Sequence, residues 1–580
     1  MSKKRKRKAT QPKAPPPRLE CTPQPLWFER LSWQIGALAV LVLLAYANSL
    51  DGKWVYDDAI IFDDPSVVGT GFGWSVFLLT QARPLTFLSF HWNYLATGEA
   101  LLSYHVVNTL LHAANAVLVL LVARRHLSSG AAFIAAALYA VHPLNTEAVS
   151  YIYQRSTTLA TLFALLSLLL FLKEQYVWSA AAFGASLLCK EETIALPIFL
   201  LLYDLLYRRR RPRLTYYVAL LGLVGLAAAR SFYVWNHASK DPTIGYRVRS
   251  VRPLSFVLTE PRVVWRYLQL FLVPVGQSVD HGIRHSTGLF SPISTLPAIL
   301  GLAVLVGLLA YLAWRGHQPA FWGLGFFILL APTSSIVPVQ DLMFEHRVYF
   351  PSVCLVIAAA QLLVLIPRRA LLPVVGVILV VLLALTIARN RLWHDSKVLW
   401  TDAIHKSPDF SHPWATMGRQ LMRIDVRSAR QYLDRAAALE PDNPGIQNDA
   451  GVAALRMSDG RAAAEHLRVA VALRPNISSY QSDMGLALFL MNDNRGALEH
   501  FQKAIALGGP KQYGWAHVGD AYYRLGQVDQ AADSYRRALQ MDPCMGGART
   551  GLVRALGAQG KLFEAAAASQ IPPGCSGGGE

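Results

Sequence analysis

Long apolar segments alternate with short polar ones along the first 390 residues of the chain. The hydrocarbon core of a bilayer is about 30 Å thick, and a helix needs roughly 20 apolar residues to cross it. The segments that approach this length are 31–50, 103–123, 131–150, 157–172, 176–190, 191–207, 214–232, 291–314, 319–337, 349–366 and 370–388. We therefore predict an all-α, polytopic membrane part with about eleven transmembrane helices. The short segments 176–190 and 191–207 also fit a re-entrant pair.

The sequence beyond Ala388 is charged and rich in alanine, and it repeats. Glycines recur at intervals of 33, 34, 34 and 32 residues, the period of the tetratricopeptide repeat, at Gly418, Gly451, Gly485, Gly519 and Gly551. The fourth copy carries most of the repeat signature, at Trp515, Gly519, Tyr522, Gly526, Ala531, Tyr535, Ala538 and Pro543. We expect a C-terminal α-solenoid whose concave face holds an extended peptide. A solvated spacer is the alternative interpretation.

Composition and charge support a membrane protein and argue against a nucleic-acid binder. Hydrophobic residues make up 53% of the 580 residues, charged residues make up 16%, and the formal net charge is +18. Most of this charge lies in residues 1–30 and at the ends of apolar segments, in Arg124, Arg125, Arg208–Arg211, Arg213, Arg315, Arg368 and Arg369. Positive residues collect on the cytoplasmic side of membrane proteins. Counting spans from a cytoplasmic N-terminus puts all these arginines inside, so the charge needs no nucleic-acid partner.

The same pattern divides the chain into successive parts. We predict a basic cytoplasmic tail at 1–30, a multi-spanning domain at 31–390 with a first outer loop at 51–102, a connector at 391–411, repeats at 412–569 and a flexible tail at 570–580. The first outer loop and the repeats then lie on the extracytoplasmic side. The five cysteines show no metal-ligand spacing, and we infer no disulfide framework from them.

Carboxylates are densest in the first outer loop. Asp57 and Asp58 are adjacent there, and apolar residues from Trp54 to Ile61 flank them. A partly apolar setting raises the pKa of a carboxylate and makes it a better general base. The loop therefore contains candidate catalytic acids. An acidic loop produced only by charge sorting across the membrane explains the same composition.

Two further groups of polar residues stand out. His105, Asn108, His112 and Asn115 share one face of an apolar helix, where packing between helices is a better explanation than metal binding. The outer segment 230–288 is an exception to charge sorting, because it contains Arg247, Arg249, Arg252, Arg262, Arg266 and Arg284. An anionic lipid headgroup or a phosphate near the bilayer edge would account for these arginines.

Eight strings, taken in order, resemble the transmembrane and tetratricopeptide-repeat-containing O-mannosyltransferases and their bacterial relatives. They are YDDAIIFDDPSV, ARPLTFLSFHWNYLATG, YHVVNTLLHAANAVL, YAVHPLNTEAVSYIYQRS, LLCKEETIALPIFLLLYDLL, YLQLFLVPVGQSVDHG, EHRVYFPS and NRLWHDSKVLWTDAIHKSP. The resemblance extends from about Leu31 to the repeats. It implies the GT-C-like fold of multi-spanning glycosyltransferases that use polyprenyl-phosphate sugars, with an acidic pair in the first outer loop.

On this resemblance, Asp57 is the catalytic base, and Asp58 orients the acceptor or shares that role. The base removes the proton of a Ser or Thr hydroxyl, and a cationic site stabilises the departing lipid phosphate. The candidates for binding the donor phosphate and the substrate are Arg83, His142, Glu147, Arg155, Lys190, Glu191, Glu345, His346 and Arg347. The reaction requires no cofactor, because Arg or Lys can neutralise the phosphate. A divalent metal ion at Asp57 and Asp58 is compatible with the same chemistry.

The resemblance implies transfer of a single sugar, mannose in the characterised branch, from a polyprenyl-phosphate carrier to Ser or Thr hydroxyls of extracytoplasmic proteins. The repeats would bind the acceptor protein. We favour the bacterial inner membrane over the endoplasmic reticulum. Two alternatives stay open: a non-catalytic, membrane-anchored tetratricopeptide scaffold, and an enzyme of the same fold that acts on a glycolipid or a polysaccharide.

Overall fold

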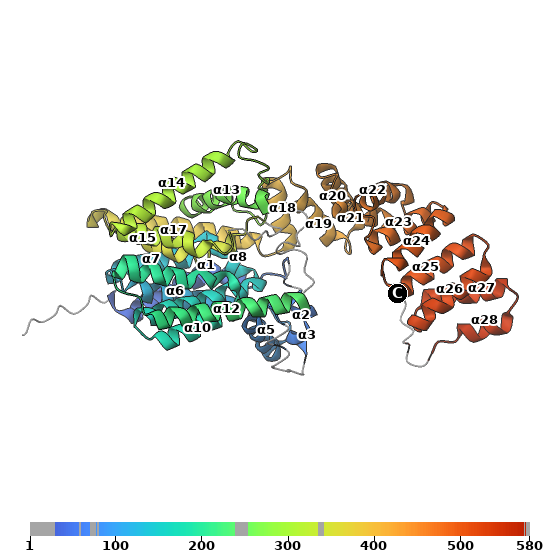
Figure 1. The fold of residues 1–580 in the computed structure, drawn as a ribbon, viewed down its shortest axis with the longest axis horizontal. Coiled ribbons are helices and arrows are strands. Elements are labelled where there is room, and N and C mark those ends of the chain that lie inside the picture. Colours follow the sequence, from blue (N-terminus) through green and yellow to red (C-terminus); the bar gives the residue numbers. More distant parts are fainter. Residues whose placement is uncertain are drawn as a thin grey trace, which may run out of the picture.

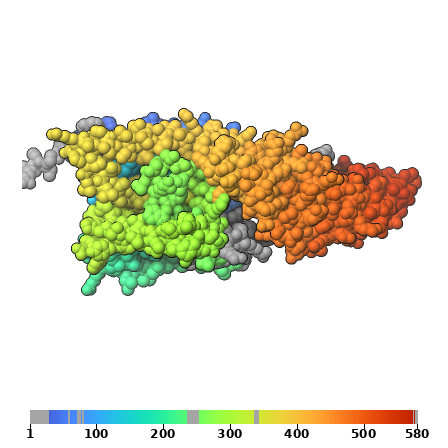
Figure 2. Space-filling model, turned by 90° about the horizontal axis from the view of Figure 1, so that it is seen from above, coloured from blue at the N-terminus to red at the C-terminus, as the bar shows by residue number. Residues whose placement is uncertain are grey.

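The computed structural model describes residues 29–56, 58, 60–69, 77, 81–237, 253–334, 342–572 and 575. Within these residues all named elements are helices, so the predicted all-α class is confirmed. Figure 1 shows a bundle of long helices on one side of the molecule and a stack of paired helices on the other. Figure 2 shows the stack, orange to red, extending away from the bundle as an arm.

Each of the eleven predicted apolar segments corresponds to a helix of the bundle. These helices are α1 (Leu31–Tyr46), α6 (Leu101–Ala123), α7 (Ser129–Val141), α9 (Arg155–Leu172), α10 (Tyr176–Cys189), α11 (Leu196–Leu202), α12 (Leu214–His237), α14 (Thr295–Trp314), α15 (Gln318–Leu330), α16 (Ser352–Leu363) and α17 (Arg368–Leu392). By length and composition, six of the helical segments in the described residues can cross a membrane, while α7, α10, α15 and α16 are apolar but shorter.

Several helices are shorter than the sequence pattern predicts, and the local sequence explains two of these cases. The helix predicted at 131–150 ends at Val141, because His142 precedes Pro143 and adopts an extended backbone (φ −75°, ψ 127°). The segment predicted at 191–207 begins as a helix only at Leu196, after a turn that contains the polar Glu191 and Glu192. The one predicted at 319–337 ends its helix at Leu330. These changes move the polar motifs out of the apolar helices.

Short elements gather at one end of the bundle, which we call the outer end. They are η2 (Ala47–Ser49), α2 (Ile60–Asp63), α3 (Pro65–Val68), α5 (Pro84–Thr97), η3 (Pro143–Asn145), α8 (Thr146–Ser150), η4 (Ile152–Gln154), η5 (Glu191–Ala195), η8 (Glu345–Val348) and α18 (Ser396–Lys406). The longer helix α13 (Pro253–Leu272) packs beside α14. The opposite end, which we call the basic end, carries the arginines near the ends of α6, α14 and α17. It also carries the π-helical turn η6 (Tyr203–Arg208).

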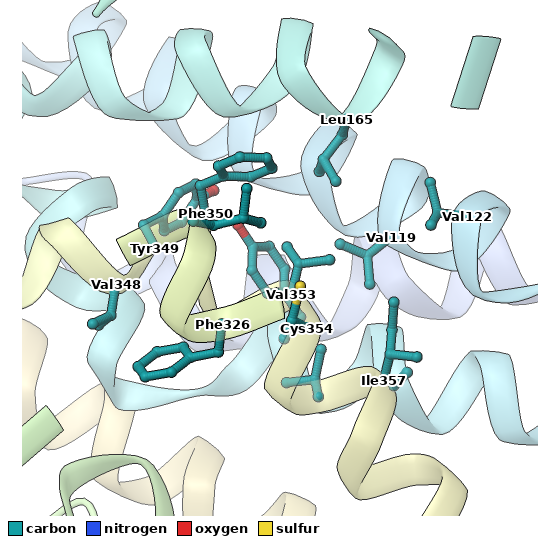
Figure 3. Packing of buried hydrophobic residues seen from close by; sticks show 14 of the residues in the cluster. Val119, Val122, Leu165, Phe326, Val348, Tyr349, Phe350, Val353, Cys354 and Ile357 are labelled. Atoms are coloured by element: carbon teal, nitrogen blue, oxygen red, sulfur yellow. The ribbon is translucent and has the colours of Figure 1, made fainter. Parts of the chain in front are cut away.

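The core of the bundle lies between α6, α7, α9 and α16. In Figure 3, Tyr349, Phe350 and Val353 face Val119 of α6 and Leu165 of α9, and all five belong to one buried apolar cluster. Close packing of this kind lets helices associate where no hydrophobic effect drives them together in lipid. The bundle therefore provides a rigid base for the short elements of the outer end.

The polar stripe of α6 lies inside this core. His112 bonds through Nδ1 to the Tyr349 hydroxyl at 2.7 Å and through Nε2 to the Ala140 carbonyl at 3.0 Å. Asn115 donates to the Thr158 carbonyl at 2.9 Å, and Asn108 donates to the Val149 carbonyl at 3.3 Å. The prediction that the stripe joins helices is confirmed for these three residues.

The C-terminal helices form the predicted array of antiparallel pairs. They are α19 (Ser411–Leu421), α20 (Val426–Leu439), α21 (Pro444–Arg456), α22 (Gly460–Leu473), α23 (Ser478–Leu490), α24 (Asn494–Ala506), α25 (Lys511–Arg524), α26 (Val528–Met541), α27 (Gly546–Ala558) and α28 (Leu562–Ser569). The repeat of about 34 residues also appears in the side-chain hydrogen bonds, because equivalent residues of successive repeats make the same bond. His466 bonds to Gln447 at 2.8 Å, and His500 bonds to Gln481 at 2.7 Å, each partner being 34 residues further along.

Glycines of the repeats lie where neighbouring helices pack closely. A Cβ on Gly519 would lie 2.7 Å from the Tyr535 ring, and one on Gly551 would lie 2.4 Å from the same ring. The sequence does not indicate a disulfide, but Cys544, between α26 and α27, forms one with Cys575, which follows α28. The expectation of no disulfide framework is therefore wrong for this pair, since the helical packing brings residues 31 positions apart together.

Candidate functional site

The first outer loop is fixed to the bundle through Asp58. Its side chain is completely buried. Its Oδ2 accepts the Val55 backbone N–H at 3.1 Å, and its Oδ1 accepts the Tyr153 backbone N–H at 2.8 Å. The carboxylate therefore holds the loop against η4. Asp57 lies outside the described residues, so its role as the catalytic base stays a prediction.

The same turn, η4, also fixes a lysine. The Lys190 ammonium donates to Gln154 Oε1 at 3.1 Å and to Thr157 Oγ1 at 2.7 Å, and it pairs with Glu192 at 2.5 Å. Burial lowers the pKa of Lys190, and the Glu192 carboxylate partly offsets this. Because Tyr153 and Gln154 are consecutive, η4 brings the Asp58 carboxylate and the Lys190 ammonium into one region.

Two arginines complete a cationic set with Lys190. Arg83 pairs with Glu191 at 3.6 Å, and the Glu191 side chain is 65% exposed. Arg230, at the outer end of α12, donates to the Ala82 carbonyl at 3.2 Å and to the Gln81 carbonyl, directly before Arg83. The sequence marks Arg230 only as part of a basic outer segment. The sequence feature that could have identified Arg230 is a single positive charge near the outer end of an apolar helix.

Glu147 and His346 form a buried pair beside the cationic set. Glu147 Oε1 bonds to His346 Nδ1 at 2.7 Å, and Glu147 Oε2 accepts the backbone N–H groups of Glu345 at 2.7 Å and of His346 at 3.2 Å. Burial, followed by the nearby Glu345 carboxylate, raises the pKa of Glu147 to about 7. Lys190 lies close enough to act electrostatically on the His346 ring, whose pKa burial lowers.

Glu345 is the centre of a second buried network. Its carboxylate accepts Gln277 Nε2 at 2.7 Å and the Ser278 backbone N–H at 3.0 Å, and it bonds to His281 Nε2 at 3.0 Å. Arg389, near the end of α17, lies 3.8 Å from it. Burial alone would raise the pKa of Glu345, but Arg389 and these hydrogen bonds hold it below its usual value. Gln277, His281 and Arg389 were not among the predicted site residues.

The side chains of three other predicted site residues form hydrogen bonds with groups of the protein itself. Arg155 is completely buried and donates to Asn108, Asn93 and the carbonyls of Ser89 and Tyr104, with its guanidinium 4.4 Å over the Phe90 ring. His142 bonds to the Phe271 carbonyl at 3.0 Å. Arg347 donates to the Leu342 carbonyl at 2.8 Å. These contacts assemble the outer end. Arg83, whose side chain is 19% exposed, is the most accessible arginine or lysine of the predicted set.

The connector helix α18 packs against the first outer loop. Tyr56, two residues before Asp58, lies 5.6 Å from the Trp400 ring of α18 and 5.8 Å from Tyr151. Arg389 pairs with Asp402 of the same helix at 3.5 Å. The repeats are therefore joined to the outer end through buried contacts as well as through the chain itself.

The described residues include no group of three or more His, Cys, Asp or Glu side chains placed to hold a metal ion. The arrangement that they do form is a carboxylate-bearing loop next to a set of cations. Such an arrangement can take up a proton on the acidic side and stabilise a departing anion on the cationic side.

Comparisons with known proteins match both parts of the chain. Residues 87–235 match the family described as dolichyl-phosphate-mannose-protein mannosyltransferase, and residues 512–543 match the tetratricopeptide repeat family. The first match begins at Phe87, within α5, and ends after Arg230, so it contains η4 and Lys190 but not Arg83.

Several curated proteins resemble this chain over part of its length. Protein O-mannosyl-transferase TMTC3 of Mus musculus is 38% identical over 122 residues, which are 19% of this chain and 13% of that protein. Protein O-mannosyl-transferase Tmtc1 of Drosophila melanogaster is 34% identical over 194 residues, 30% of this chain and 23% of that protein. Protein O-mannosyl-transferase TMTC2 of Mus musculus is 29% identical over 290 residues, which are 42% of this chain and 34% of that protein.

The matched segments thus span between 13% and 34% of the length of these relatives. Among solved structures, the crystal structure of MamA covers 26% of this chain at 21% sequence identity and a TM-score of 0.25. The resemblance predicted from the eight ordered strings is confirmed by the sequence comparisons. Residues 87–235 match the mannosyltransferase family, residues 512–543 match the tetratricopeptide repeat, and protein O-mannosyl-transferases resemble part of the chain.

Proposed function

We propose that this chain transfers mannose from a polyprenyl-phosphate carrier to Ser or Thr hydroxyls of proteins on the extracytoplasmic side of a membrane, in bacteria the inner membrane. The names of the relatives and of the matching family support the reaction class. The observation that carries the proposal is the turn η4, where the Tyr153 backbone binds Asp58 and the Gln154 side chain binds Lys190. The loop of the predicted base and the cationic set meet there.

The reaction divides between these two groups. The acceptor oxygen bonds to the anomeric carbon, the bond from that carbon to the phosphate oxygen breaks, and the electron pair leaves with the lipid phosphate. The hydroxyl proton passes to a carboxylate of the first outer loop, for which Asp57 is the predicted residue. Arg83 and Lys190 stabilise the phosphate charge, as oriented cations in a water-poor site do effectively.

The acidic loop supplies a matched pair of variants to test the base. Asp57→Asn and Asp63→Asn make the same chemical change in the same loop, and Asp63 is exposed on α2. With purified full-length protein, polyprenyl-phosphate mannose and a Ser/Thr-containing acceptor, Asp57→Asn should reduce the rate at least about 100-fold. Asp63→Asn should keep it within about twofold of wild type. Equal rates for wild type and Asp57→Asn would remove Asp57 from the mechanism.

The repeats, on this proposal, bind the protein acceptor. The structure indicates where to cut, because α18 contacts the first outer loop and His412 of α19 bonds to Asp280 of the outer end at 2.8 Å. A chain ending at Glu440 keeps α18, α19 and α20. It should still transfer mannose to a short peptide but should modify a folded acceptor protein more slowly. Unchanged modification of the protein acceptor would show that α21–α28 do not select it.

The two alternative functions give different results in the same assays. A non-catalytic scaffold would show no transfer with wild type and no effect of Asp57→Asn. An enzyme for glycolipid or polysaccharide would consume the polyprenyl-phosphate sugar while leaving every peptide and protein acceptor unmodified.

A further inference from the structure

A small cavity lies at the basic end of the bundle, between η6 and the connection from α14 to α15. Its volume is about 310 Å³, and it is lined by Leu206, Tyr207, Arg209, His317, Gln318 and Phe321, among others. The cavity is therefore at the opposite end of the bundle from the candidate active site, and the proposed function does not use it.

The backbone holds Arg209 at the cavity. Arg209 ends the π-helical turn in a left-handed conformation with φ 52°, which is uncommon for a residue with a side chain. Its Nη2 donates to the Trp314 carbonyl at 3.1 Å. Gly316 makes room for the guanidinium, because a Cβ there would lie 3.2 Å from Arg209 Nη2.

Arg209 differs from its neighbours in having no acidic partner. Arg208 lies 3.6 Å from Asp204, and Arg210 lies 3.1 Å from Glu174. Among the described residues, no carboxylate pairs with Arg209. The guanidinium has five N–H donors in a planar fork that suits a phosphate group, and its contact with Trp314 engages a neutral carbonyl, which leaves the charge unpaired. The cavity thus carries an uncompensated positive charge.

The cavity also lies where lipid headgroups are expected. Only 6% of the apolar window of α14 is buried inside the protein, so this helix faces its surroundings along its length. Tyr311 and Trp314 near its end are 51% and 64% exposed. Tyr and Trp are enriched at the level of the headgroups in membrane proteins. The loop that follows them, with Gly316 and His317, is then at headgroup depth.

We propose that this cavity binds the headgroup of an anionic phospholipid, with the phosphodiester on Arg209. The side chains of Tyr207, His317 and Gln318 surround the phosphate and glycerol oxygens with polar groups, while Leu206 and Phe321 contact the first carbons of the acyl chains. The volume suits a headgroup and not a whole lipid. A neutral lipid would leave the charge of Arg209 uncompensated, whereas an anionic one supplies the missing partner.

The proposal is tested by lipid binding to the full-length protein in nanodiscs or in native mass spectrometry. Phosphatidylglycerol should be retained in preference to phosphatidylcholine, and Arg209→Gln should weaken phosphatidylglycerol binding roughly fivefold, the effect of about one positive charge near a membrane surface. Arg209→Lys should restore part of it, since a lysine keeps the charge but not the planar fork. A thermal unfolding curve for Arg209→Gln checks that the variant folds.

Arg211→Gln is the matched control, because it makes the same charge change two residues away and Arg211 does not line the cavity. It should leave phosphatidylglycerol binding near wild type. An equal loss in both variants would mean that only the general charge of this end attracts lipid, which overturns the proposal. Equal retention of phosphatidylcholine overturns it too. Displacement of phosphatidylglycerol by a polyprenyl phosphate at much lower concentration would assign the cavity to the isoprenoid lipid instead.

Discussion

Both ends of the helix bundle carry arginines, but the two ends differ in how deeply their basic side chains are buried. At the outer end, Arg155 and Lys190 are buried and hydrogen-bonded to oxygen atoms, and Arg389 is buried and paired with Glu345 and Asp402. At the basic end, Arg211 and Arg315 are exposed to solvent. A buried charge costs several kcal/mol unless it is paired and hydrogen-bonded, whereas an exposed one costs almost nothing. The stability of the outer end therefore depends on where the partners of its buried charges lie. At the basic end, the number of exposed positive charges matters more than their exact positions.

The largest test of this difference is Arg155→Met, which removes a buried cation but keeps much of its length. We expect it to lower the free energy of unfolding by about 3–5 kcal/mol, because Asn108, Asn93 and two backbone carbonyls lose their donor. Arg211→Met at the basic end should change it by less than about 0.5 kcal/mol. Denaturant unfolding of both variants in detergent micelles measures the difference. Similar values would show that burial does not distinguish the two ends.

A second test uses the buried Glu147, whose pKa is about 7 in the fold against an ordinary value of 4.5. Between these two values the unfolded chain has released a proton that the folded protein keeps. The free energy of unfolding should therefore fall as the pH rises from about 4.5 to 7 and then level off. Glu147→Gln should flatten this decline. Thermal unfolding at pH 5 and pH 8 measures it.

The control for this titration is Glu99→Gln, at an exposed position of the same end. It should follow the wild-type curve. If the wild-type protein became more stable between pH 5 and pH 7, and Glu147→Gln removed that gain, the pKa of Glu147 would not be raised in the fold.

A smaller effect is expected where the outer end meets the repeats. Asp280 Oδ2 and His412 Nδ1 are 2.8 Å apart, and their side chains are 20% and 34% exposed. A partly exposed pair of this kind contributes about 0.5–1 kcal/mol. In a double-mutant cycle with Asp280→Asn and His412→Asn, the coupling in unfolding free energy should lie in that range. Strict additivity would mean that the pair does not hold α19 to the outer end.

The helices were predictable because hydropathy and period act locally. Eleven apolar segments and a repeat of about 34 residues can be read directly from the sequence, and the structure contains the corresponding helices. The early end of α7 was also accessible in principle, since His142-Pro143 interrupts the segment. Its apolar residues continue beyond the proline, however, and hydropathy alone extended the helix to 150.

The partners of the polar residues were not predictable. Glu147 and Glu345 are 198 positions apart and share one network, and Gln277 and Arg389 join it from two further segments. The motif positions showed that these residues occur together in a family, but only packing shows that Glu345 bonds to protein donors. Arg83, Lys190 and Arg230 converge for the same reason, through carbonyls and side chains that no spacing rule connects.

The smallest expected effect belongs to Arg315, whose guanidinium lies 6.0 Å from the Tyr311 ring at the exposed end of α14. Arg315→Gln should change the free energy of unfolding by less than about 0.5 kcal/mol, because solvent screens the charge and an exposed cation–π contact contributes little. Raising the salt concentration should remove even that difference. Denaturant unfolding at low and high salt measures both. A loss of about 2 kcal/mol or more would mean that the basic end, like the outer end, holds its charges in a required geometry.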